Sequence, residues 1–367
     1  MIIYIIFFVC NILFGLSLCV SGRKFCPNEL NQNKIKRKIY LIVTTLQYGL
    51  LCGLRATSMG YDTFSYQIIF WMTPGSWSTI FVRTSYVEMG FSVLCSLVKI
   101  LGGNYQMLLI ICSLFSMGAC CVFLNRHSTN IILSVFIIIS FPFFYSQFDV
   151  VRHFLAIGCF LLAYKYIEEK KLIKYLIFII IGATFHKIVL LFIPLYFIRK
   201  IKFDAAFVII MVAATAILYL FLTEIVVFIG ELMGKAGTSL VETGFLGADA
   251  GGFKTMLMYA AILVLSFLAY LLIDEKKDSD RVYIFYVALV VVASIISTNA
   301  RIAIRFIMSF VPLMSIAIPH LFSFNRTSSK KVMIALTIGF VLIGLIYHGF
   351  MLISNWSNVV PYIPYMQ

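Results

Sequence analysis

The sequence predicts an all-α, polytopic integral membrane helix bundle with about ten to twelve transmembrane helices. Two observations carry this prediction. The 367 residues are 62% hydrophobic and only 12% charged, whereas about a quarter of the residues in a soluble domain are charged, so the charges are too few to coat a water-facing surface. Apolar stretches also recur along the whole chain, and about 20 apolar residues are enough for a helix to cross the hydrocarbon core.

The expected spans follow one another from the first residues onward. They lie at 2–20, 39–54, 64–82, 88–102, 104–124, 130–147, 153–167, 175–198, 203–223, 255–273, 282–298, 303–322 and 332–353. The first stretch lacks a positive region and a small-residue cleavage site, so we expect it to remain as a helix of the mature protein. The stretch 64–82 contains Gln67, Pro74 and Gly75, which leaves open a weak span or an interfacial or re-entrant piece.

Lysines and arginines gather in five short loops, and these loops predict the orientation. The clusters are Arg23–Lys38, Lys165–Lys174, Arg199–Lys202, Lys276–Arg281 and Arg326–Lys331. The positive-inside rule places all five on the cytoplasmic side. The rule conflicts with a single span at 175–198. One span would place its two ends on opposite sides of the membrane, but both ends carry basic residues. A re-entrant hairpin bent near His186 would remove the conflict, because each arm would be too short to cross alone.

Several classes of function are excluded by composition and by missing motifs. The formal charge of +14 resides in short loops, so nucleic acid is not an expected partner. Most of the nine cysteines lie within apolar runs and suit membrane packing. There is no phosphate-binding loop, dinucleotide fingerprint or zinc motif, so we expect neither a cofactor nor a metal. No repeat or soluble domain is visible, and we expect one membrane domain over 1–367.

Ionisable side chains are expensive within a membrane and therefore mark candidate sites. Arg55 and Asp62 lie on a glycine-containing turn at the outer end of the second helix, with Tyr66 close behind. They could bind a polar head group, or form an interfacial ion pair with a tyrosine anchor. Glu88 could act as an acid or base at the start of a helix, although helix starts favour acidic residues in any case.

Two further segments place polar residues between apolar stretches. Arg152 and His153 open a helix, and a guanidinium group suits phosphate binding in a partly buried site; the alternative is an ion pair with Asp149, three residues earlier. His186 and Lys187 interrupt an apolar stretch at its centre, which points to a hydrated cavity. Histidine fits general base work near neutrality, or it could simply bond one helix to another.

Arg301 and Arg305 are four residues apart, so on a helix they share one face. Two like charges in this arrangement repel each other unless an anion lies beside them. A diphosphate would serve as that anion. The alternative is that both side chains extend to lipid head groups of the outer leaflet.

The order of these motifs resembles the EpsG family of polysaccharide polymerases, a branch of the Wzy-type membrane polymerases. The resemblance is strongest over 50–195, and the residues that carry it are Gly53, Leu54, Arg55, Gly60, Asp62, Thr63, Tyr66, Glu88, Gly90, Phe91, Phe148, Arg152, His153, Ala156, Phe185, His186 and Lys187. The family commonly has glutamine where this chain has His153, and often serine where it has Ile188. These two departures bear on substrate contacts and leave the fold unaffected.

The resemblance implies glycosyl transfer between lipid-linked oligosaccharides in capsule, exopolysaccharide or O-antigen assembly. A growing glycan would pass from an undecaprenyl diphosphate carrier to another lipid-linked repeat unit, at the outer face of the cytoplasmic membrane and without a metal. Donor, acceptor and membrane lipid would be the main partners. A flippase and a chain-length regulator would be protein partners.

The same chemistry suggests roles for the polar residues, because guanidinium groups can stabilise a leaving diphosphate and an acceptor hydroxyl needs a base. The expected diphosphate ligands are Arg152, Arg301 and Arg305, with support from Arg55. The expected base is His186, followed by Asp62 and then Glu88. The other polar residues of the expected site are Tyr66, His153 and Lys187.

Three other functions remain open from the sequence. A lipid-linked oligosaccharide flippase or transporter would also bind an anion through membrane arginines, but it would favour repeated halves. A glycosyltransferase of the GT-C type would use a polyprenyl monophosphate sugar, with Asp62 as the catalytic acid. A scaffold of an assembly complex would need no chemistry from Arg152.

Overall fold

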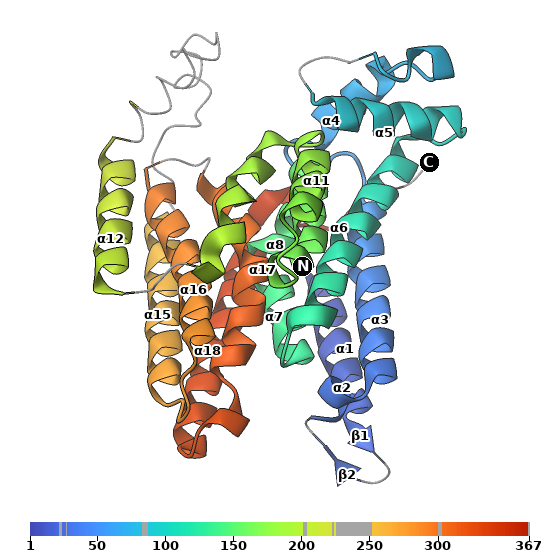
Figure 1. Cartoon of the computed structure of the whole chain (residues 1–367). Coiled ribbons are helices and arrows are strands. Elements are labelled where there is room, and N and C mark those ends of the chain that lie inside the picture. The colour runs from blue at the N-terminus through green and yellow to red at the C-terminus, as the bar shows by residue number, and fades with distance from the viewer. Residues whose placement is uncertain are drawn as a thin grey trace. The chain divides into compact units, whose positions relative to one another are not determined.

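The structure, a computed structural model, describes residues 1–21, 24–26, 28–82, 87–200, 204–221, 224, 252–299 and 303–365. The chain forms two compact units. Unit 1 comprises Met1–Ile198 and Tyr347–Gln367, and unit 2 comprises Arg199–Ile346. The described elements are helices apart from one small hairpin of β1 (Val20–Ser21) and β2 (Lys24–Phe25) (Figure 1). The expectation of a single membrane domain stays a prediction.

Unit 1 contains most of the elements. Its helices are α1 (Ile2–Leu18), α2 (Glu29–Gln32), α3 (Lys34–Gly53), α4 (Thr63–Met72), η1 (Trp77–Thr79), α5 (Met89–Ile100), α6 (Tyr105–His127), α7 (Ile131–Ser140), α8 (Pro142–Ser146), α9 (Val151–Ala163), α10 (Lys165–Glu168), α11 (Leu172–Ala183), η2 (Lys187–Lys200) and η5 (Trp356–Asn358). Unit 2 contains α12 (Ala205–Leu220), α15 (Gly252–Leu271), α16 (Asp278–Ser297), α17 (Ile304–Leu321) and η4 (Phe324–Arg326). The long helix α18 (Lys330–Ile353) belongs to unit 2 at its start and to unit 1 at its end.

Among the described helices, α6, α15, α16, α17 and α18 are each long and apolar enough to cross a membrane. The predicted class, an all-α polytopic membrane bundle, is confirmed, and the protein is a multi-pass membrane protein. Several expected spans are shorter or interrupted. Residues 88–102 form only α5, whose 12 residues extend about 18 Å, well below the roughly 30 Å of a hydrocarbon core. The stretch 64–82 likewise forms only the ten-residue α4 and the short η1.

The close packing of α3 on α6 depends on two glycines. Gly49 and Gly53 are four residues apart and so lie on one face of α3. A Cβ atom on Gly53 would lie 2.8 Å from the Cα of Ile110, and one on Gly49 would lie 2.8 Å from the Leu114 side chain. Small residues with this spacing let membrane helices approach closely. These two glycines let α3 and α6 pack closely, and the end of α3 and the start of α6 lie next to the candidate functional site.

The hairpin predicted within 175–198 is present as α11, a bend at Thr184–His186 and η2. The Tyr175 hydroxyl in the first arm donates to the Phe192 carbonyl in the second at 2.6 Å. The rings of Tyr175 and Tyr196 lie 5.5 Å apart. The two arms of the hairpin therefore lie side by side within unit 1, as a re-entrant hairpin requires.

The basic loops of unit 1 gather at one end, which we call the basic end. Arg37, at the start of α3, donates to the carbonyls of Leu124 and Ser128 at 2.8 and 2.9 Å and so closes the end of α6. His127 at that helix end lies 3.2 Å from Glu168 in α10. Figure 1 shows β1 and β2 at this end, and α4 and α5 at the opposite one.

In unit 2, α16 packs along α17 and against α15. Asp280, fully buried in the first turn of α16, accepts a hydrogen bond from Arg326 Nη2 at 2.7 Å. The His320 Nε2 atom lies 2.8 Å from the same carboxylate. These contacts tie the segment before α18 to the start of α16.

Candidate functional site

Four segments that are far apart in the sequence meet at the end of unit 1 opposite the basic end. The backbone nitrogen of Asp62 donates to the Asp149 carboxylate at 2.8 Å, which joins the turn before α4 to the turn before α9. The backbone nitrogen of Gly90 donates to the Thr184 carbonyl at 2.8 Å, which joins the start of α5 to the hairpin bend. We call this region the polar cluster; its ionisable or polar members are Asp62, Tyr66, Glu88, Asp149, Arg152, His153, His186 and Lys187.

The centre of the polar cluster is an ion pair between Arg152 Nη1 and the Glu88 carboxylate. The two side chains are 20% and 17% exposed, so the pair is largely desolvated but reachable. The Arg152 guanidinium also lies over the Tyr66 ring, 5.5 Å from its centroid. Its Nε atom is buried and has no hydrogen-bond partner in the described part of the chain. Arg152 therefore has one donor that the described residues leave without a partner, beside its ion pair with Glu88.

The polar cluster is held in place by one apolar core. Val87, Val151 and Tyr66 are all buried members of a single hydrophobic cluster, and Phe185 packs against it. Val87, Val151 and Phe185 each directly precede an ionisable residue of the polar cluster, and Tyr66 is itself a member of it. Since buried side chains are close-packed, this shared core fixes the relative positions of Glu88, Arg152 and His186.

The Phe148 carbonyl joins the turn before α9 to the turn before α4. It accepts hydrogen bonds from Arg55 Nη2 at 3.1 Å and from the Thr63 hydroxyl at 3.0 Å. Gly60 has a φ of +83°, and a Cβ at this position would lie 2.0 Å from the same carbonyl oxygen. No residue other than glycine fits there, because both the conformation and the space exclude a side chain.

Arg55 is fully buried and makes contacts within the protein. Besides Phe148, its guanidinium donates to the Cys52 carbonyl at 2.7 Å and lies 5.4 Å from the centroid of the Phe148 ring. A buried arginine that donates to carbonyl groups positions the backbone, but the Nε atom of Arg55 has no hydrogen-bond partner among the described residues. The expected support of Arg55 for a diphosphate stays a prediction.

His186 is brought to the polar cluster by the hairpin bend. Its ring lies 5.5 Å from that of His153, which is buried next to Arg152. The Nδ1 atom of His186 accepts a hydrogen bond from the Ile188 backbone nitrogen at 3.2 Å. A neutral ring with this bond carries its proton on Nε2, so Nε2 acts as a donor. Lys187 follows as an exposed residue.

The structure describes one residue of the arginine pair expected at 301 and 305. Arg301 lies outside the described residues. Arg305 belongs to unit 2, in the first turn of α17, where its side chain is partly buried and its carbonyl accepts a hydrogen bond from Ser309. The predicted diphosphate contacts of Arg301 and Arg305 stay predictions.

The segment after α18 completes the scaffold of the polar cluster, which we did not predict from the sequence. The backbone of Leu54 and Ala56 bonds to that of Tyr365 and Ile363, at 2.8 Å in both cases. The Asn358 side chain donates to the Ser58 carbonyl at 3.2 Å. These bonds hold the turn that carries Gly60 and Asp62. The aromatic residues after the last span were the only available signal.

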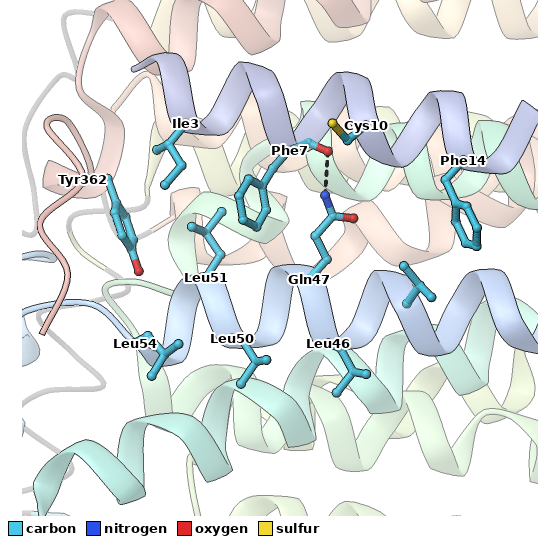
Figure 2. Close-up of a pocket in the computed structure, with 11 residues that line it drawn as sticks. Ile3, Phe7, Cys10, Phe14, Leu46, Gln47, Leu50, Leu51, Leu54 and Tyr362 are labelled. Carbon is cyan, nitrogen blue, oxygen red and sulfur yellow. Dashed lines mark hydrogen bonds between the residues drawn. The ribbon is translucent and has the colours of Figure 1, made fainter.

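An apolar groove of about 610 Å³ lies between α1 and α3 (Figure 2). One end of the groove, on the left in Figure 2, is lined by Ile3, Leu54 and Tyr362, and Phe14 lies at the other end. The one amide in its lining, that of Gln47, donates to the Phe7 carbonyl at 2.7 Å. The groove is therefore suited to hydrocarbon. Among the described residues there is no group of three His, Cys, Asp or Glu that could hold a metal ion.

A comparison with known families identifies the chain. The model of the EpsG family matches residues 38–364, which is nearly the whole chain and includes all four segments of the polar cluster. The chain belongs to the EpsG family. EpsG is a family of Wzy-type polymerases, which supports a general role in polysaccharide polymerisation. Comparisons with curated proteins and with solved structures give no match.

Proposed function

We propose that this EpsG-family protein polymerises oligosaccharide repeat units that are linked to undecaprenyl diphosphate. The observation that carries the proposal is the ion pair of Glu88 and Arg152 in a largely desolvated cluster. Such a pair offers a cation for a departing phosphate and a carboxylate for an incoming hydroxyl, which are the two groups that glycosyl transfer requires.

In the proposed reaction, the diphosphate of the donor replaces Glu88 on the Arg152 guanidinium. The acceptor hydroxyl oxygen then bonds to the anomeric carbon as the bond from that carbon to the phosphate oxygen breaks. The electron pair of the broken bond leaves with the undecaprenyl diphosphate, whose negative charge Arg152 stabilises. The released Glu88 carboxylate accepts the hydroxyl proton. Each group is thus used once, and no metal is needed.

We rank the candidate bases differently from the order expected from the sequence. His186 is expected there as the base, but in a neutral ring the bond from the Ile188 amide to Nδ1 makes Nε2 a donor. We therefore propose Glu88 as the base and His186 as a hydrogen-bond donor to the donor phosphate or sugar. Asp62 is partly exposed and is the second candidate for the base.

The proposed site faces the outside of the cytoplasmic membrane. The basic loops of unit 1 are at the opposite end from the polar cluster, as the contacts of Arg37 and His127 show. Basic loops remain in the cytoplasm. Lipid-linked units that a flippase delivers to the outer face would meet the cluster there, and a chain-length regulator would act on the product.

The test is a deletion strain complemented with wild-type protein, Arg152→Ala or Arg126→Ala. Arg126 is an exposed residue at the basic end and provides the same change of charge as a control. We expect Arg152→Ala to lose the polymer ladder by at least about 10²-fold, with single lipid-linked units accumulating on the outer face, and Arg126→Ala to behave as wild type.

The other functions give different outcomes in the same strains. Accumulation of units on the cytoplasmic face would indicate a flippase. A repeat unit shortened by one sugar would indicate a transferase that acts before polymerisation. Normal polymer from the Arg152→Ala protein would indicate a scaffold. Each of these outcomes would overturn the proposal.

A further inference from the structure

The segment between α3 and α6 exposes several large aromatic residues. Phe64, Trp71, Trp77 and Phe81 are 58%, 60%, 67% and 75% exposed; we call these four residues the aromatic face. The opposite side of α4 is also apolar, since Tyr66 and Phe70 are buried in the core of unit 1. A helix that is apolar on both sides needs a second apolar environment besides the protein core.

The depth of this segment is tied to a membrane-spanning helix. The hydroxyl of Tyr105, the first residue of α6, donates to the Thr63 carbonyl at 2.7 Å. Since α6 is long and apolar enough to cross the membrane and is capped by the polar Asn104, we expect its first residue to lie near the level at which the chain leaves the hydrocarbon. The first turn of α4 therefore lies at that level.

Carbonyl groups at the end of α4 accept hydrogen bonds from side chains of the protein. Lys99 Nζ donates to the carbonyls of Trp71 and Thr73 at 3.0 and 2.6 Å, and the Thr73 hydroxyl donates to the Ile69 carbonyl at 2.7 Å. Unsatisfied carbonyl groups are costly away from water. Lys99 also lies 5.1 Å from the Phe70 ring centroid. A lysine that caps a helix end in this way suits the boundary between hydrocarbon and head groups.

We propose that α4 and η1 lie in the interfacial layer of the bilayer on the side of the polar cluster, with the aromatic face against lipid. The proposal does not depend on the proposed chemistry, because it uses only the membrane-spanning α6 and the exposed side chains. Tryptophan favours this layer, since its ring is apolar and its N–H group can reach water. The ten residues of α4 extend only about 15 Å, so the helix cannot be a span.

The test uses the three tryptophans of the chain. Full-length proteins that each keep one tryptophan, with phenylalanine at the other two positions, are placed in nanodiscs that contain brominated phospholipid. Trp356 donates to the Ser146 hydroxyl at 3.1 Å and is partly buried, so the Trp356 protein is the matched control. A single symmetric peak in size-exclusion chromatography and an unchanged thermal unfolding midpoint show that each variant is folded.

We expect the emission of Trp71 and Trp77 to be lost most with bromine near the head group, less with bromine near the chain end, and little with aqueous iodide. The Trp356 protein should lose less emission with either lipid. Stronger quenching by chain-end bromine would mean that the segment is a span. Quenching by iodide alone would mean that the aromatic face meets water. Quenching by neither bromine nor iodide would mean that it meets a protein partner. Any of these results would overturn the proposal.

Discussion

The Gly90 nitrogen lies 2.8 Å from the Thr184 carbonyl oxygen and fastens the start of α5 to the bend that carries His186. Glu88 is two residues before this contact, and His186 is two residues after it. The base proposed for the reaction and the histidine are therefore positioned by one backbone hydrogen bond. The contact depends on the absence of a side chain at position 90.

A methyl group at position 90 should separate these two elements. Its carbon would lie 2.3 Å from the Thr184 hydroxyl oxygen and 2.8 Å from the carbonyl oxygen, so we expect Gly90→Ala to lose polymer and about 1–3 kcal/mol of stability. Gly349→Ala is the control, because a Cβ there meets nothing within 4 Å. Thermal unfolding in detergent and the polymer ladder measure the two effects. Equal behaviour of both variants would show that the contact is dispensable.

The ion pair should respond differently to changes at its two ends. Glu88→Gln keeps the shape of the side chain but removes its charge, so we expect Arg152 to bind the lipid-linked donor at least as tightly while turnover falls by about 10²–10⁴-fold. Arg152→Lys should weaken donor binding as well, because lysine lacks the planar fork. Binding of the purified donor and turnover are measured separately. Weaker donor binding by Glu88→Gln would contradict the proposed displacement.

The hydrogen bond to His186 Nδ1 predicts which substitute is tolerated. Glutamine can place an amide N–H group near the position of Nε2, so we expect His186→Gln to retain more polymerisation than His186→Ala. A required base would not be replaced by an amide, which does not take up a proton near neutral pH. Initial rates of both variants decide the question. Equal loss in the two would restore His186 as the base.

The segment after α18 should be required for polymerisation. Removal of residues from Asn355 onward deletes the partners of Leu54, Ala56 and Ser58, and the turn that carries Asp62 loses its support. We expect insertion into the membrane to persist and polymer to be lost. Removal of residues 366–367 alone is the control. Normal polymer from the longer deletion would show that the turn holds its shape without these bonds.

Both chain ends should lie on the outer side. The Tyr4 hydroxyl donates to the Val359 carbonyl at 2.8 Å, so the start of α1 lies beside the segment that pairs with Arg55. Alkaline phosphatase fused after residue 367 should be active, since it needs an oxidising compartment. Green fluorescent protein inserted near Lys170, in a basic loop, should fluoresce. The reverse pattern would place the polar cluster in the cytoplasm.

The sequence predicted those parts of the fold that depend on local pattern. Hydropathy identified the membrane class, and the basic residues on both sides of 175–198 identified a hairpin bent at His186. The individual spans were less accurate, because apolarity alone does not distinguish α5, which packs against α6, from a helix that crosses. Pro142 similarly interrupts the span expected at 130–147, since it has no N–H group to continue the helix.

The arrangement of the site was predicted only in part. Costly charges marked Glu88, Arg152 and His186, but no pattern in one sequence shows that Glu88 pairs with a residue 64 positions later. The burial of Arg55 was also invisible, because it depends on the carbonyl of Phe148, 93 positions away. Long-range pairs of this kind are set by packing and not by local sequence.

The bond between Asn358 and Ser58 joins residues 300 positions apart. At about 5–20 residues per second, the turn around Ser58 is made roughly 15–60 s before its partner leaves the ribosome. During that time the early helices can enter the membrane, but the turn with Gly60 and Asp62 lacks its support. If the proposed function holds, we expect a nascent chain that already carries every arginine and carboxylate of the polar cluster to stay inactive until Asn358 has been made.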